Sequence, residues 1–84
     1  MKKERYIVEE KNIKYRKEFY NFIVDTFELK VCGSQEQFVN NIFPFVVDFK
    51  TKRFWVCDSI AILKLAEEND LVITIDEFMD RIFK

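Results

Sequence analysis

The sequence predicts a single α+β domain, and three features support this fold class. A helix-length segment from Asn12 to about Leu29 carries a polar residue at every third or fourth position. Two aromatic and β-branched runs, joined by a short polar connection, lie between Phe45 and Cys57 and are typical of a β-hairpin. The length of 84 residues fits one domain, residues 1–84, and the 49% hydrophobic content supplies its core.

The chain is expected to begin with an arm and two helices. Residues 1–11 alternate charged residues with one short apolar run, which favours an extended arm or an edge strand. Asn12 is suited to cap the first helix, since its side chain can accept a hydrogen bond from the first turn. Ser34 begins a capping-box sequence, so a second helix is expected from there to about Phe43, where Pro44 stops it.

The first helix has more apolar surface than a surface helix needs. Its polar residues form a stripe roughly 100° wide, given 3.6 residues per turn. Most of the remaining circumference is apolar: Ile13, Tyr15, Phe19, Tyr20, Phe22, Ile23, Val24, Phe27 and Leu29. Either other elements enclose this helix on several sides or part of its aromatic surface meets a partner. Tyr15 and Tyr20 are the candidate contact residues on it.

The hairpin is the centre of the predicted fold. A tight connection over Lys50–Arg53 would place Phe49 opposite Phe54 and Asp48 opposite Trp55. Because side chains alternate along a strand, one face is apolar and suits the core: Val47, Phe49, Phe54 and Val56. The other face is mixed, with a tryptophan beside a basic tip: Val46, Asp48, Lys50, Arg53, Trp55 and Cys57.

Two further helices are expected after the hairpin, both on one face of the sheet. Asp58 or Ser59 caps the first of them, which runs to about Asn69 and is apolar enough to be central to the core. Leu71–Ile73 is either a third strand, reached by a parallel right-handed crossover, or a helix–helix connection. Thr74–Glu77 fits another capping box, which starts the last helix.

The composition argues against the common catalytic and metal-binding classes. The chain has no histidine, which removes histidine acid–base chemistry and most zinc sites. Cys32 and Cys57 are interpreted as small buried hydrophobic residues in a reducing cytosol, in preference to a disulfide or a reactive thiol. No phosphate-binding, dinucleotide-binding or calcium-binding motif occurs. We therefore expect no catalytic residue, no metal site and no cofactor.

Charge and hydropathy point to a cytoplasmic protein that acts by contact. No signal peptide or bilayer-length apolar run is present, and the net charge is −1. The basic residues concentrate near the N-terminus and at the hairpin. The leading hypothesis is a small non-enzymatic protein-interaction module, resembling phage or mobile-element accessory proteins and small inhibitors in size and composition, and able to form a homodimer.

The candidate contact residues centre on the hairpin: Asp48, Lys50, Lys52, Arg53 and Trp55, with Tyr15 and Tyr20 as a second patch. The rival hypothesis is a nucleic-acid-binding protein that uses the basic tip from Lys50 to Arg53 together with Trp55. Cations neutralise phosphates, and an exposed aromatic ring can stack on a base. Arg5 and its neighbours Lys2 and Lys3 would extend this patch only if the N-terminal arm lies beside the hairpin.

Overall fold

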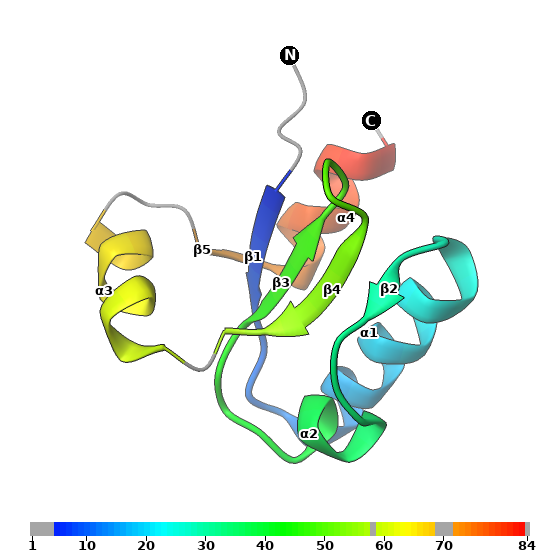
Figure 1. The fold of residues 1–84 in the computed structure, drawn as a ribbon, viewed down its shortest axis with the longest axis horizontal. Coiled ribbons are helices and arrows are strands. Elements are labelled where there is room, and N and C mark those ends of the chain that lie inside the picture. Colours follow the sequence, from blue (N-terminus) through cyan, green and yellow to red (C-terminus); the bar gives the residue numbers. More distant parts are fainter. Residues whose placement is uncertain (1–4, 58, 69–71, 84) are drawn as a thin grey trace.

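Within the described residues, 5–57, 59–68 and 72–83, the computed structural model has a five-stranded mixed sheet with strand order β2-β4-β3-β1-β5 (Figure 1). The elements in chain order are β1 (Arg5–Glu9), α1 (Ile13–Thr26), β2 (Lys30–Val31), α2 (Gln35–Val39), β3 (Phe45–Asp48), β4 (Arg53–Val56), α3 (Ile60–Glu68), β5 (Val72–Thr74) and α4 (Ile75–Phe83). The predicted α+β class and the central hairpin are confirmed. The predicted layout of two helices, hairpin and two helices is wrong in detail, because the sheet is larger than the hairpin.

The N-terminal segment is a central strand of the sheet. β1 pairs antiparallel with β3 on one side and parallel with β5 on the other. Tyr6, Ile7 and Val8 are all buried, so both faces of this strand are covered. The prediction of an arm or edge strand was wrong because a short apolar run without alternation is what a strand covered on both faces requires.

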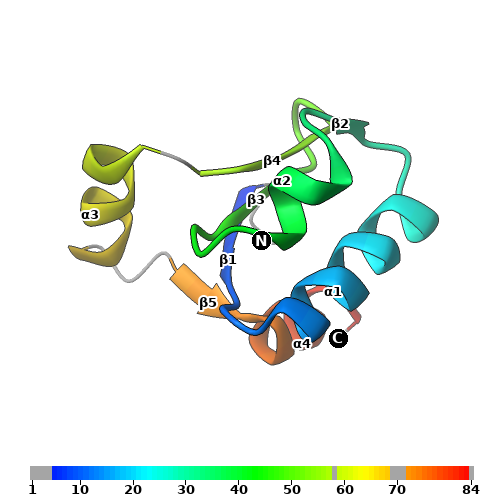
Figure 2. The same cartoon turned by 90° about the horizontal axis from the view of Figure 1, so that it is seen from below.

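Two crossovers place helices on opposite faces of the sheet. α1 leads from β1 to β2 at one edge, and α3 leads from β4 to β5 at the other edge. Because the connections travel in opposite directions, a common hand puts their helices on opposite faces, as Figure 2 shows. The expectation that α3 and α4 share a face was therefore wrong. β5 confirms the strand alternative for this segment, whose residue Leu71 lies outside the described part of the chain.

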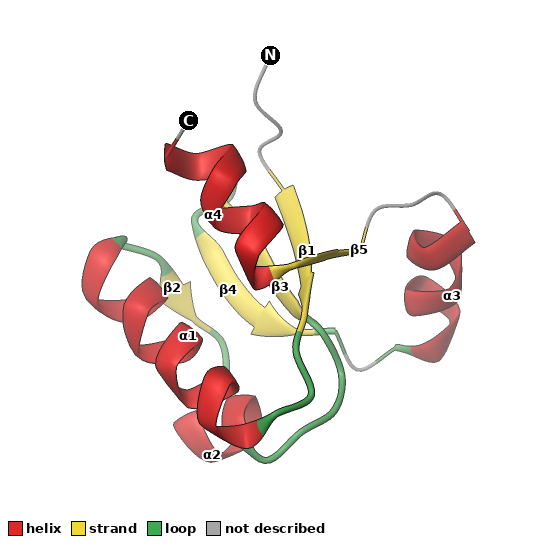
Figure 3. Cartoon of the chain, turned by 180° about the vertical axis from the view of Figure 1, so that it is seen from behind, coloured by secondary structure: helices red, strands yellow, loops and turns green. Residues whose placement is uncertain are grey.

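The main core lies between the first face of the sheet and the helices α1, α2 and α4 (Figure 3). Its buried residues are Tyr6, Val8, Phe19, Ile23, Phe38, Phe45, Val47, Phe54, Ile73 and Phe78. Much of the broad apolar surface of α1 is covered by α2 on one side and by α4 on the other. Tyr20 packs on Phe38 of α2 at 5.0 Å, and Phe22 packs on Phe83 of α4 at 6.0 Å, both between ring centroids.

Arg16 lies on the core side of α1 although it is charged. Its side chain is 0% exposed, its Nε donates to the backbone oxygen of Phe38 at 2.9 Å, and its Nη1 donates to the backbone oxygen of Glu10. The guanidinium carbon lies 4.2 Å from the centroid of the Phe45 ring. Arg16 thus joins the start of α1 to the end of α2, which the sequence did not predict.

The hairpin register differs from the predicted one by two residues. Asp48 pairs with Arg53 and Val46 with Trp55, so the connection is Phe49–Lys52. The Asp48 carboxylate causes the difference, because its Oδ1 accepts hydrogen bonds from the amides of Lys50 and Thr51, at 3.0 and 3.2 Å. A shift of two residues keeps every side chain on its predicted face, so the partition of the strands into an apolar and a mixed face is unaffected.

The predicted starts of the first two helices are confirmed, whereas their ends were predicted too late. Asn12 Oδ1 accepts from the Lys14 amide at 2.9 Å, and Ser34 forms a complete capping box. α1 ends early because the following residues join β4 as β2, with the Lys30 amide donating to the Lys52 oxygen at 2.8 Å. α2 ends at its C-cap Asn40, before a turn in which Asn41 Oδ1 accepts from the Phe43 amide at 2.9 Å.

The two C-terminal helices differ in how far they enter a core. α4 begins as predicted, with Thr74 Oγ1 accepting from the Glu77 amide at 3.2 Å, and it buries Phe78. α3 is not central to the main core. Its Leu63 is half-buried on a smaller cluster on the second face, and Ile60 is 61% exposed. Of the two predicted caps, Asp58 lies outside the described residues, as does the predicted helix end at Asn69. Ser59 directly precedes α3, and its backbone oxygen accepts a hydrogen bond from the Leu63 amide at 2.9 Å.

Candidate partner-binding surface

The second face of the sheet carries a row of charged side chains that crosses four strands. Lys30 pairs with Arg53, Arg53 with Asp48, and Asp48 with Arg5, and paired residues point to the same side of a sheet. Trp55 lies on the same face, in β4. We call these residues, Arg5, Lys30, Asp48, Arg53 and Trp55, the basic face. Figure 2 shows α3 near one end of this side of the sheet, while α1, α2 and α4 cover the other side.

An ion pair fixes one end of this row. Arg5 donates from Nη2 and Nε to Oδ2 of Asp48, at 2.8 and 3.0 Å. The Arg5 side chain stays 60% exposed, whereas the Asp48 side chain is 2% exposed. Asp48, a predicted contact residue, therefore holds Arg5 and the hairpin turn in place and offers almost no surface to a partner.

The pKa of the Asp48 carboxyl lies below its ordinary value. Burial alone raises this pKa, but the hydrogen bonds from Arg5, from Thr51 and from the Lys50 amide together outweigh burial. The carboxylate is therefore charged at neutral pH, and Arg5 is held in its position by a negative partner.

Trp55 is half-buried between a cation and an apolar cluster. The Arg5 guanidinium carbon lies 5.6 Å from the centroid of its ring. The indole also packs against the cluster of Ile7, Val46 and Cys57 on the second face. Arg53 lies two positions before Trp55 on the same face of β4, so the indole has one cation over its ring and another beside it in its own strand.

The hairpin connection adds two exposed cations beside the basic face. Lys50 and Lys52 are both exposed, and Lys52 adopts a positive φ of 58° that closes the turn. The structure thus brings together the predicted residues Lys50, Lys52, Arg53 and Trp55. Sequence reasoning missed Lys30, since nothing local indicates that the residues after α1 pair with β4. Arg5 does join the hairpin, whereas Lys2 and Lys3 lie outside the described residues.

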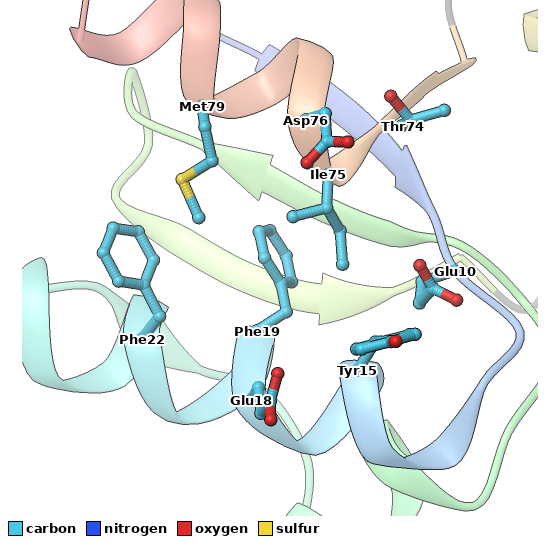
Figure 4. A pocket seen from close by; sticks show the side chains of 9 residues that line it. All are labelled: Glu10, Tyr15, Glu18, Phe19, Phe22, Thr74, Ile75, Asp76 and Met79. Atoms are coloured by element: carbon cyan, nitrogen blue, oxygen red, sulfur yellow. The ribbon is translucent and has the colours of Figure 1, made fainter.

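The second predicted patch, Tyr15 and Tyr20, is not one surface. Tyr20 is half-buried between α1 and the sheet, with its ring 5.0 Å from Phe38 and 6.1 Å from Phe54. Tyr15 is 50% exposed and borders a cleft between α1 and α4 (Figure 4). Five positions along a helix correspond to a rotation of about 140°, so the two rings point in different directions.

Cys32 and Cys57 are free thiols. Cys57 is buried, as the sequence indicated, whereas Cys32 is exposed, so the interpretation of Cys32 as a buried residue was wrong. In the described ranges, no group of three or more cysteine or carboxylate side chains is arranged to hold a metal ion. Among the same residues, no helix combines the length and apolar character that a membrane crossing requires.

Comparison of this chain with protein-family models, with curated proteins and with solved structures finds no match. Any inference about function therefore rests on the geometry of the basic face.

Proposed function

We propose that this protein is a non-enzymatic, cytoplasmic protein-interaction module that binds an acidic protein partner through its basic face. The observation that carries the proposal is the half-buried Trp55 between exposed arginines on a rigid sheet. Tryptophan and arginine are the residues most enriched among the energetic centres of protein interfaces. A sheet also holds such side chains with little loss of conformational freedom on binding.

The charge of the surface defines the partner. The basic face and the adjoining hairpin connection carry the cations Arg5, Lys30, Lys50, Lys52 and Arg53. The carboxylate among them, Asp48, is already neutralised by Arg5. Such a surface attracts acidic side chains and repels a second basic surface, so charge complementarity favours one class of partner. A homodimer in which two basic faces meet is disfavoured for the same reason, and an acidic partner is preferred to a second copy. An inhibitor or accessory protein of a phage or mobile element would act through such a contact.

Single-stranded nucleic acid is the second candidate, favoured by the same cations. Proteins that bind single strands use successive aromatic rings on which bases stack. On the basic face, as far as the structure describes it, Trp55 is the aromatic residue, and Arg5 already occupies a position over its ring. An acidic protein therefore fits the surface better than a nucleic acid does.

The experiment is affinity capture from the native host with charge-reversal variants. Arg53→Glu reverses a charge within the basic face, and Lys17→Glu makes the same change at an exposed position of α1, on the other side of the sheet. We expect wild type and Lys17→Glu to capture the same acidic protein and Arg53→Glu to lose it. Equal capture by both variants would refute the proposal. Capture of RNA or DNA that is lost steeply with salt would instead support the second candidate.

A further inference from the structure

A second feature of the molecule is a cleft between α1 and α4, on the side of the sheet away from the basic face (Figure 4). Its volume is about 680 Å³. Phe19 and Phe22 project from α1 toward Ile75 and Met79, which project from the beginning of α4. The floor of the cleft is therefore apolar, and it lies on rigid elements that belong to the main core.

The rim of the cleft is acidic. Glu10 comes from the connection between β1 and α1, Glu18 from α1 and Asp76 from the first turn of α4. No lysine or arginine lines the cleft among the described residues. Both Glu18 and Asp76 are exposed, while the Glu10 carboxylate accepts one hydrogen bond, from the Asn12 amide at 3.0 Å. These carboxylates retain most of their capacity to accept hydrogen bonds from a ligand.

An aromatic ring stands at the same rim. Tyr15 is half exposed and borders the cleft on the side of Glu10. A tyrosine ring attracts a cation held near its face, and this attraction adds to that of neighbouring carboxylates. Arg16 does not line the cleft: its guanidinium donates to the backbone oxygens of Phe38 and Glu10 and lies over the ring of Phe45. It therefore offsets part of the negative charge at Glu10, whereas Glu18 and Asp76 stand farther along the rim.

We propose that this cleft binds a small organic cation with an apolar body, in particular a free primary amine carrying an aromatic or alkyl group. The apolar body would rest on the partly exposed side chains of Phe22, Ile75 and Met79, and the ammonium would lie among the rim carboxylates beside Tyr15. The volume falls within the range of roughly 300–1,000 Å³ typical of small-molecule sites, and apolar walls with a few polar groups are typical of them too. This site is independent of the basic face and of the partner proposed for it.

The test is a titration of the full-length, isotope-labelled protein by NMR, with the phenethylammonium ion as probe. 2-Phenylethanol and phenylacetate serve as the neutral and anionic probes of similar shape. We expect saturable shifts of amide signals in residues 15–22 and 74–79 with phenethylammonium. Binding of the alcohol should be at least about tenfold weaker, because the rim carboxylates attract only a cation electrostatically. The anion should not bind, because the same carboxylates repel it.

Matched variants separate the site from general attraction to an acidic protein. Glu18→Gln and Asp76→Asn should each weaken phenethylammonium binding about two- to fivefold, as expected for loss of one exposed ionic contact. Asp25→Asn removes an exposed carboxylate of α1 that does not line the cleft, and it should leave binding unchanged. The amide spectrum of each variant verifies that it is folded. Absence of saturable shifts, equal binding of the alcohol, or equal effects of all three variants would overturn the proposal.

Discussion

Replacing Arg16 with methionine should destabilise the fold although it removes a buried charge. The methionine would keep much of the aliphatic volume but leave the backbone oxygens of Phe38 and Glu10 without their donor. A hydrogen bond from a charged group contributes about 1.5–3 kcal/mol, so the two together contribute about 3–6 kcal/mol.

Part of this loss is recovered, since burying the guanidinium has its own cost. Burial lowers the pKa of Arg16, with Glu10 opposing that shift, and in the described residues its Nη2 is the buried side-chain polar atom without a partner. An unsatisfied buried group costs about 1–3 kcal/mol. Subtracting the midpoint of this cost from the midpoint of the hydrogen-bond contribution gives an expected net loss of about 2–3 kcal/mol for Arg16→Met. The stability of a chain of this length is about 4–13 kcal/mol in all.

Urea denaturation followed by far-ultraviolet circular dichroism measures this difference. Lys17→Met is the matched control, since it removes the neighbouring charge from an exposed position and should change stability by at most about 0.5 kcal/mol. An Arg16→Met protein as stable as wild type, or more stable, would refute the reasoning. It would mean that desolvation of the charge outweighs both hydrogen bonds, as occurs in some buried ion pairs.

Three further substitutions test the Asp48 ion pair, the backbone at Gly33 and the main core. Because the pKa of Asp48 is lowered in the folded state, its contribution to the free energy of unfolding is complete above about pH 4. This contribution is lost as the pH falls through the pKa of the folded state. Asp48→Asn should cost about 1–2 kcal/mol at neutral pH, with the difference from wild type shrinking toward pH 2 in denaturant titrations; an unchanged difference would contradict this. Gly33→Ala should cost about 1–3 kcal/mol by thermal denaturation, since φ is 138° and a Cβ atom would lie 2.8 Å from Gln37 Oε1; an unchanged midpoint would contradict it. Phe54→Ala should cost about 3–5 kcal/mol by the same assay, since its ring is buried against Phe38 at 4.6 Å; a loss under 1 kcal/mol would place Phe54 outside the core.

Local signals in the sequence were reliable, because the interactions behind them are local. The caps at Asn12, Ser34 and Thr74 each join groups within three residues of one another, and each was predicted from its sequence. The two faces of the hairpin were also predicted correctly, although the register was not, because the Asx turn at Asp48 moved the pairing by an even number of residues.

Pairing between strands that are far apart in the sequence could not be predicted from local sequence patterns. The order of the strands decides that β1 is central and that β2 and β5 form the edges, and a run of three apolar residues does not encode its neighbours. Arg16 was missed for a related reason. Helical periodicity assigns a charged residue to the solvent-facing side. Arg16 instead shares the core-facing side of α1 with Phe19 and Ile23, three and seven positions after it.

The candidate surface was predicted in part. The cations of the hairpin and Trp55 were identified from their place beside a turn, but Lys30 joins them only through the pairing of β2 with β4. The role of Asp48 also depended on a partner far along the chain, since Arg5 and Asp48 are 43 residues apart in sequence.

Site-specific photocrosslinking in the native host tests whether the basic face is the surface that contacts a partner. A photoreactive phenylalanine derivative is placed at Lys52, beside the basic face, or at Lys17 as the control on α1. We expect position 52 to crosslink to an acidic protein and position 17 to give no such crosslink. Crosslinks to that protein from position 17 alone, or crosslinks from position 52 to nucleic acid only, would contradict it.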